Sequence, residues 1–158
     1  MPADRVERGL FRDLTVLEHY GLYKASDSKT LNWEKIKTIA SKKISEFNIK
    51  ANFSNKVSEL SGGNQQRLML SLMPEAQSIL LLEQPTRGLD LNSAQNIWEM
   101  ILSRKSKDIA IIFSSTDIDE IWDYSEIIIS VSGRFILNVD YKKHLTKDKI
   151  INYVSGIV

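Results

Sequence analysis

Two almost continuously apolar runs place the strongest constraint on the fold of this chain. One covers residues 78–82 and the other is DIAIIFSS, residues 108–115. Helical patterns follow them at 92–105 and 117–124. Apolar runs that alternate with helices are typical of a parallel sheet with both faces covered. The sequence therefore predicts an α/β fold in which these two runs are buried strands.

The first third of the chain has a helical pattern instead. Residues 14–24 have apolar positions at helical spacing, with Thr15 as the expected N-cap. Residues 32–47 form a clearer amphipathic helix that Asn32 caps. A helical segment therefore precedes the α/β part of the chain.

The last part of the chain predicts a hairpin and a short helix. EIIISVSGRFILNVD indicates two strands that turn at Ser132 and Gly133. The closing helix is expected over 146–155. The first ten residues are interpreted as a loop, and Arg5 and Arg8 as solvated surface residues.

Composition excludes several classes of protein. The net charge of +1 gives no general attraction to nucleic acid or acidic lipid, and the absence of cysteine excludes disulfides and thiolate metal sites. His19 and His144 are too far apart in sequence to suggest a metal cluster. No apolar run approaches the roughly 20 residues that span a bilayer, and the polar N-terminus does not resemble a signal peptide. We therefore expect a soluble, cytoplasmic protein.

The segment LSGGNQQR, residues 60–67, is a candidate anion site. Ser61 offers a hydroxyl, Gly62 and Gly63 allow close approach of the backbone, and a helix N-terminus presents free N–H groups. A glycine turn that only caps a helix would have the same residues. Taken alone, this segment fits both interpretations.

The segment ILLLEQPTRGLD, residues 79–90, is an apolar strand that ends in two polar side chains. Such a strand end is a common place for a phosphate or metal site. Glu83 supplies a carboxylate, but Gln84 is an amide and cannot act as a general base. The pair therefore raises the question of what such a site could do.

Taken together, the two segments resemble the nucleotide-binding domain of ABC transporters. Leu60–Gln65 match the family's signature motif, Ile79–Gln84 match Walker B, and Gly88–Asp90 match the D-loop. LSGGNQQR and PTRGLD are the forms typical of importers for sugars and nucleosides. PADRVERGL with LTVLEHY is similar to the second ATPase half of their tandem-ATPase subunits. The resemblance implies an α/β fold, namely a partial P-loop NTPase (RecA-like) core with a mainly parallel sheet plus a helical subdomain.

The resemblance covers nearly the whole chain and implies one partial domain over 1–158. The helical subdomain is expected at about 10–60 and the second half of the core at 61–158. The Walker A half is absent, because none of the seven glycines is followed by lysine as G-x-x-x-x-G-K-[ST] requires. We therefore expect the chain to be the C-terminal portion of a longer domain.

Three positions depart from the family's pattern. At the position of Glu83 the family has an Asp that helps to hold magnesium, and at the position of Gln84 it has a Glu that activates water. At the position of Thr116 the family has its switch histidine. Glu83 can still reach a metal, whereas Gln84 and Thr116 lack the catalytic groups. An engineered change at residue 84 would leave the other two unexplained. The resemblance therefore implies a degenerate ATP site in this half and an inactive isolated chain.

The resemblance also implies cofactors and partners. ATP and Mg²⁺ are the expected cofactors, and in the family each ATP lies between one half's P-loop and the other half's signature. Ser61, Gly62, Gly63 and Gln65 would then face the γ-phosphate of an ATP held by a partner ATPase half, with Asp90 in the D-loop. Transmembrane permease subunits are further partners, a solute-binding protein is an indirect one, and nucleic acid is not expected. The protein would be peripheral on the inner face of the cell membrane.

The main functional prediction is the ATPase component of an ABC importer for a sugar or nucleoside. One alternative is a soluble ABC protein that acts on ribosomes or chromosomes, although the basic linker or coiled-coil heptads of such proteins are not in this sequence. The other is a non-catalytic regulatory ABC module. Arg5 and Arg8 would sense nucleotide or contact the permease in the family, which stays the alternative to a surface role.

Overall fold

The computed structural model describes residues 1–25, 30–74, 78–104 and 109–154. These form two compact units, Met1–Phe113 and Ser114–Val158, and each is described by itself. The boundary predicted near residue 60 lies within the first unit. Among the described residues, no helix has the length and apolarity needed to cross a membrane.

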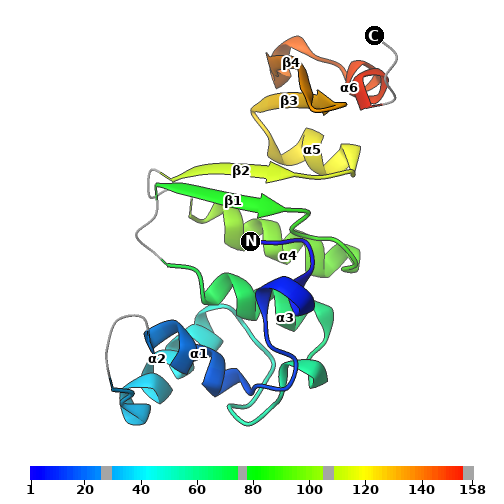
Figure 1. The fold of residues 1–158 in the computed structure, drawn as a ribbon. Helices are drawn as coiled ribbons and strands as arrows, with labels where there is room; N and C mark the ends of the chain where they lie inside the picture. The colour runs from blue at the N-terminus through cyan, green and yellow to red at the C-terminus, as the bar shows by residue number, and fades with distance from the viewer. Residues whose placement is uncertain (26–29, 75–77, 105–108, 155–158) are drawn as a thin grey trace. The chain divides into compact units, whose positions relative to one another are not determined.

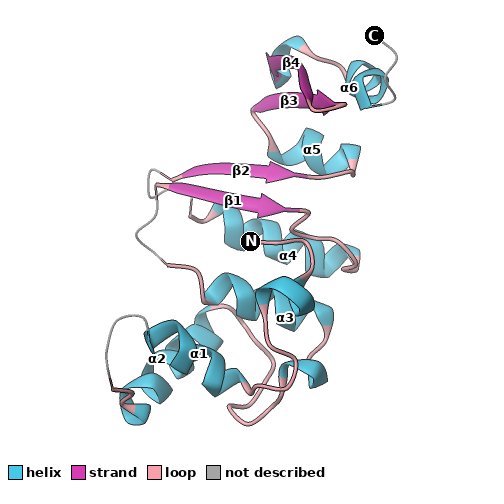
Figure 2. Ribbon diagram, viewed as in Figure 1, coloured by secondary structure: helices cyan, strands magenta, loops and turns pink. Residues whose placement is uncertain are grey.

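The first unit contains the longer helices (Figures 1 and 2). In chain order these are α1 (Val16–Ala25), α2 (Trp33–Glu46), α3 (Gly62–Ser71) and α4 (Leu91–Leu102). Residues Arg5–Gly9 form a short π-helix, η1, so the prediction of a loop over the first ten residues is wrong there.

The caps of the first two helices are confirmed. Thr15 and Glu18 form a reciprocal pair: the Glu18 amide donates to Thr15 Oγ1 at 3.2 Å, and the Thr15 amide donates to Glu18 Oε2 at 2.7 Å. Such a capping box satisfies two backbone donors that the helix itself cannot. At the start of α2, Asn32 Oδ1 accepts from the Lys35 amide at 3.1 Å.

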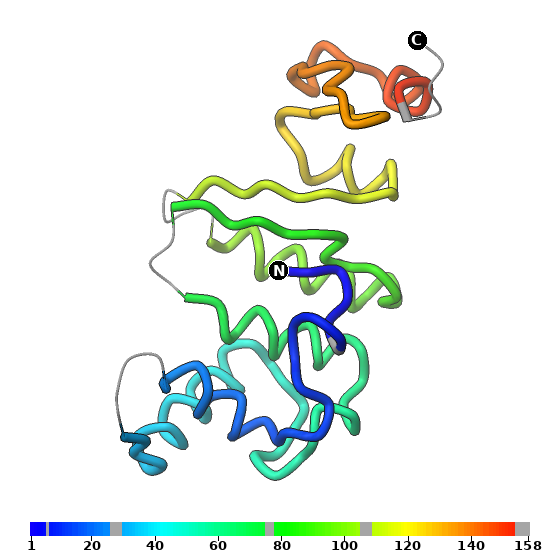
Figure 3. The backbone as a smooth tube through the Cα atoms, viewed as in Figure 1, coloured from blue at the N-terminus to red at the C-terminus, as the bar shows by residue number. Residues whose placement is uncertain are grey.

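The strands β1 (Ile79–Glu83) and β2 (Ala110–Ser114) form a two-stranded sheet and run parallel (Figure 1). The N-terminal residues lie along β1 as well (Figure 3). The Met1 amino group donates to the Leu81 carbonyl at 2.6 Å, and the Glu83 amide donates to the Met1 carbonyl at 2.9 Å. These bonds satisfy backbone groups at an edge of β1 that β2 leaves free.

One face of β1 is open, although the apolar run by itself predicts a strand that is covered on both faces. Leu80 and Leu82 are buried, whereas Ile79 is 55% exposed and Leu81 59% exposed. The alternation follows the two-residue period of a strand with one packed face. On the packed side, Trp98 of α4 contacts Phe113 of β2 edge to face, with ring centroids 4.7 Å apart.

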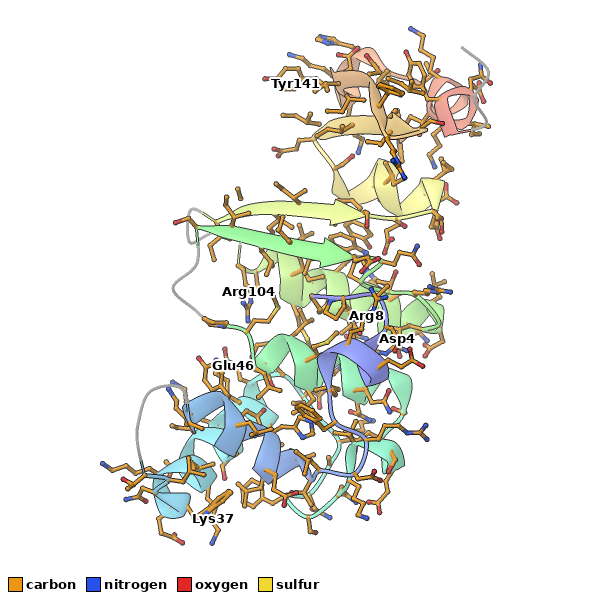
Figure 4. The ribbon with its side chains drawn as sticks, in the orientation of Figure 1. Asp4, Arg8, Lys37, Glu46, Arg104 and Tyr141 are labelled. Carbon is orange, nitrogen blue, oxygen red and sulfur yellow. The ribbon has the colours of Figure 1, made fainter. Side chains whose placement is uncertain are left out.

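The core of the first unit lies between the helices and the packed face of the sheet. Its fully buried members include residues from α1, α2, α3, α4 and β1: Val16, Tyr20, Ala40, Leu68, Leu70, Leu80, Ile97, Trp98 and Ile101. Arg104, labelled in Figure 4, is buried after α4 and donates to the Leu70 carbonyl of α3 at 3.0 Å. This cation satisfies a carbonyl in the last turn of α3, where helix carbonyls lack partners.

The second unit contains α5 (Ile118–Tyr124), β3 (Ile127–Ser132), β4 (Phe135–Tyr141) and α6 (Lys147–Val154). Its core joins Ile128, Leu145 and Ile150 with side chains of α5 and α6. The predicted helix over 146–155 is confirmed within the described residues, and residue 155 lies outside them.

The hairpin is confirmed, but its turn lies one residue further on than predicted. Ser132 pairs with Phe135, so the turn consists of Gly133 and Arg134. Their φ angles are 55° and 73°. Positive φ at both positions defines the turn type whose twist matches that of paired strands.

Candidate functional site

Ser61 lies at the N-terminus of α3, where the sequence predicts an anion site. Its Oγ accepts from the Asn64 amide at 3.4 Å and from Asn64 Nδ2 at 2.9 Å, so it caps the helix. Ser61 itself is exposed. Within the described parts of the chain, the amides of Gly62 and Gly63 have no acceptor. The helix start therefore combines a hydroxyl, two free donors and the positive end of a helix dipole.

The two glycines allow this helix start to lie close to the segment before α4. A Cβ at Gly62 would lie 3.5 Å from Leu89 Cδ2, and one at Gly63 would lie 3.2 Å from Ser93 Oγ. The structure thus brings the LSGG segment against the segment that begins α4. The two motifs that the sequence singled out are neighbours in space.

Asp90, the last residue of the D-loop match, is the N-cap of α4. Its carboxylate accepts from the Ser93 amide at 3.0 Å and from Ser93 Oγ at 2.7 Å. Hydrogen bonds from the Ser93 side chain and backbone hold the pKa of Asp90 below its ordinary value. The carboxylate is exposed and ionised, which gives the segment beside the signature a fixed negative charge.

Gln65 lies on the first turn of α3, but its amide group is directed towards the preceding segment. Its Nε2 donates to the carbonyls of Val57 at 3.0 Å and Leu60 at 3.2 Å. These bonds hold the segment before Ser61 in place. A contact between Gln65 and a phosphate stays a prediction, and in this structure both of its Nε2 bonds go to backbone.

Glu83 and Gln84 lie at the carboxyl end of β1, as predicted. Glu83 Oε2 accepts from the Ala3 amide at 3.2 Å. Gln84 has a φ of 42°, in the left-handed region that non-glycine residues rarely adopt. Such a conformation costs on the order of 1 kcal/mol and persists only when the surrounding structure imposes it.

Thr116 is exposed and follows β2, in the turn before α5. It belongs to the second unit, whereas Gln84 belongs to the first. A shared site for the two residues therefore stays a prediction.

From the sequence alone, Arg5 is interpreted as a solvated surface residue, with nucleotide sensing or permease contact as the alternative. Its side chain is half-buried: Nη1 donates to the Arg87 carbonyl at 2.8 Å and lies 3.5 Å from Gln66 Oε1. Burial lowers the pKa of its guanidinium, with an opposing contribution from Asp4. The interpretation of Arg5 as a solvated surface residue is therefore wrong, because its hydrogen-bond partners lie 61 and 82 residues away.

Gln66 is a residue that the sequence reasoning missed, although it lies within the signature segment. It is 1% exposed, and its Nε2 donates to the Pro85 carbonyl at 2.5 Å. Pro85 directly follows Gln84 and is buried. A run of three polar residues, Asn64 to Gln66, gave no indication of which one faces the interior.

The donors at the end of β1 suit only part of a magnesium site. Mg²⁺ takes oxygen ligands, commonly one or two carboxylates together with phosphate and water oxygens. Glu83 supplies one carboxylate and Gln84 one amide oxygen. In the described ranges, no group of three or more His, Cys, Asp or Glu residues could hold a metal. A magnesium ion here would depend on phosphate and water for its other ligands.

Solved structures with a similar fold identify the class of this domain. The chain aligns with an ATP-binding cassette in a dimeric post-hydrolysis state bound to ADP and Pi at a TM-score of 0.70 and 23% identity, covering 84% of this chain and 59% of that one. An inward-facing metal-chelate type ABC transporter aligns at a TM-score of 0.78 and 12% identity. This alignment covers 96% of this chain and 61% of the transporter chain. The fold is that of a partial ABC ATPase domain, as predicted. No protein-family model matches the chain.

Curated relatives then specify the type of ABC ATP-binding subunit that the chain resembles. The ribose import ATP-binding protein RbsA of Caldanaerobacter subterraneus is 30% identical over 99% of this chain and 33% of its own length. The xylose import ATP-binding protein XylG of Geobacillus kaustophilus is 29% identical over 97% of this chain and 31% of its own length. The nucleoside import ATP-binding protein NupA of Lactococcus lactis is 30% identical over 95% of this chain and 31% of its own length. The chain thus resembles the ATP-binding subunits of sugar and nucleoside importers, and it spans about a third of the length of these relatives.

Proposed function

We propose that this chain is part of the ATPase component of an ABC importer for a sugar or nucleoside. Its task in that assembly is to complete the ATP site of a partner ATPase half. The observation that carries the proposal is the start of α3, where Ser61 and the free amides of Gly62 and Gly63 present donors at a helix N-terminus. The relatives' names support the class of transported solute.

In this proposal Ser61, Gly62 and Gly63 bind the γ-phosphate of an ATP held by the partner's P-loop. ATP supplies the phosphoanhydride bond, and the chain supplies preorganised donors. Donors fixed by a helix cap need no reorganisation as negative charge develops on the phosphate, which is the main source of electrostatic catalysis. Gln65 supports this arrangement through its bonds to the segment before the helix.

The other site, next to β1, is proposed to be degenerate. Gln84 can hold a water molecule by hydrogen bonds but cannot take its proton. Glu83 would be the one carboxylate for Mg²⁺, and Thr116 would take the place of the switch histidine. Asp90 would fix the segment that passes between the two sites through its cap on α4.

The helical segment at about 10–60 is proposed to dock on a transmembrane permease subunit, and 61–158 to form the second half of the core. A solute-binding protein would then act on the assembly from the other side of the membrane. Deletion of the helical segment should release the complete subunit from membranes that contain the permease. Retention on the membrane after the deletion would contradict this docking role.

The test measures the rate of ATP hydrolysis by a complex reconstituted from this chain, the P-loop half, the partner ATPase half and the permease. Variants of this chain are compared with the unaltered chain in that complex. Ser61→Glu places a negative charge against a phosphate and should lower turnover by about a hundredfold or more. Gln84→Glu should change turnover by less than about threefold, because Thr116 still lacks an imidazole. Ser103→Glu makes the same substitution at an exposed serine of the first unit that lies outside the helical segment and the signature segment, and it serves as the control.

Normal turnover with Ser61→Glu would refute the proposed role of α3. A large gain with Gln84→Glu would show that the site beside β1 is the catalytic one. The isolated chain should not bind ATP with micromolar affinity in calorimetry, because it has no G-x-x-x-x-G-K-[ST] loop to hold the phosphates. A complex that binds ATP without hydrolysing it would favour the regulatory alternative.

A further inference from the structure

A junction centred on Arg5 joins α3, called the signature helix because it begins within the signature segment, to the turn that follows β1. Arg5 Nη1 donates to the Arg87 carbonyl at 2.8 Å and lies 3.5 Å from Gln66 Oε1. A Cβ at Gly62 would lie 3.2 Å from Arg5 Nη2, and one at Gly88 would lie 3.9 Å from the same atom. The guanidinium therefore packs against both segments at once.

Gln66 makes a second link between the same two segments. Its Oε1 lies 3.5 Å from Arg5 Nη1, and its Nε2 donates to the Pro85 carbonyl at 2.5 Å. Gln66 and Pro85 are both buried, so water cannot replace this bond. Loss of such a partner leaves a buried carbonyl unsatisfied, which destabilises the folded state. The turn is thus held to α3 from two sides.

We infer that Arg5 and Gln66 are positioning residues that make the start of α3 and the turn Pro85–Gly88 move together. A displacement of Ser61 by a ligand would then reach Gln84, whose left-handed backbone precedes the turn. Under the proposed function, on which this step rests, Ser61 serves one ATP and Gln84 another. The junction would therefore couple the two nucleotide sites through contacts inside this ATPase half.

Coupling of this kind needs a direct test, because proximity alone does not establish it. The first readout uses the isolated chain and does not depend on the proposed function. Ser61→Ala alters the start of α3, and the response is the change in the amide NMR shifts of Arg87 and Gly88. In the Arg5→Ala background this response should fall to less than about a third of its normal size, as expected when a shared partner carries the coupling.

Two further variants make the readout specific. Arg8→Ala removes an exposed arginine from the same short helix and should leave the response unchanged. Arg8 is labelled in Figure 4. Arg5→Lys keeps a donor for the Arg87 carbonyl but loses the planar fork, so it should restore part of the response. An equal response in the Arg5 and Arg5→Ala backgrounds would overturn the inference.

The second readout is ATP turnover by the reconstituted complex. Arg5→Ala should lower kcat about tenfold and leave KM for ATP within about twofold, because the P-loop that binds ATP is untouched. Unchanged kcat together with a lost shift response would overturn the link to catalysis. If the unaltered complex hydrolyses no ATP, the proposed function fails, and the shift response alone then decides the inference.

Discussion

The hydroxyl of Tyr20 donates a hydrogen bond to Ser71 Oγ across 2.7 Å and joins α1 to α3. The direction of this bond follows from the second bond of Ser71, whose hydrogen goes to the Leu68 carbonyl at 2.7 Å. Tyr20 is 1% exposed, so its ring and its hydroxyl are both removed from water. The contact fixes the signature helix to the helical segment of the first unit.

Tyr20 should make the chain sensitive to alkali. Burial raises the pKa of Tyr20 to about 12, from an ordinary value of 10.0. Below pH 10 both the folded and the unfolded states keep the proton, but between pH 10 and 12 the unfolded state loses it first, so stability falls as pH rises. Tyr20→Phe should reduce this loss by on the order of 2 kcal/mol in denaturant titrations at pH 9 and pH 11.5. An equal loss in both proteins would contradict the assignment.

His19 should make the first unit sensitive to acid. Its Nδ1 donates to the Thr15 carbonyl at 2.8 Å and its Nε2 accepts from the Phe11 amide at 3.0 Å, so the ring is held neutral. Burial lowers its pKa from 6.5, against smaller opposing contributions from Thr15 and Glu18. Below pH 6.5 the unfolded state therefore binds a proton more readily, and stability falls as pH falls through the lowered folded value.

The unfolding temperature, measured at a series of pH values from 7.5 to 5, should show this loss of stability. His19→Gln, which keeps one donor and one acceptor, should make the unfolding temperature depend less on pH. His144→Gln changes an exposed histidine of the second unit and is the control. A pH dependence unaltered by His19→Gln would show that other groups cause it.

The open face of β1 should promote self-association of the isolated chain. Ile79 and Leu81 are 55% and 59% exposed, and Ile112 of β2 is 52% exposed. Exposed apolar side chains on a sheet favour contact with another chain. Light scattering at rising concentration should show dimers or larger species, and Leu81→Lys should reduce them. Leu91→Lys is the control, since Leu91 is 84% exposed at the start of α4; a strict monomer would contradict the prediction.

Arg134 should be a site where substitution stabilises the hairpin. Its φ of 73° lies in the left-handed region, where a side chain costs about 1 kcal/mol that glycine avoids. Arg134→Gly should therefore raise the unfolding temperature of the second unit, and Arg134→Val should lower it, because a β-branched residue fits this region poorly. Calorimetry checks both, and a neutral Arg134→Val would contradict the turn geometry.

The sequence by itself determined the local elements and the motifs. Asn32 and the Thr15–Glu18 pair set helix starts, because a capping bond joins residues only three apart. The apolar runs indicated β1 and β2, and the glycine in the hairpin located its turn to within one residue. The resemblance to ABC ATPases rested on contiguous segments, and the comparisons confirm it.

Only the tertiary structure decided which of these residues meet. The two hydrogen-bond partners of Arg5 lie 61 and 82 residues away, and the Met1 amino group bonds a carbonyl 80 residues away. Periodicity cannot indicate such contacts, because they depend on how separate elements pack and not on the neighbours along the chain. The same reason explains the open face of β1: an apolar run shows that a strand can be buried, but only the packing of other elements covers each face.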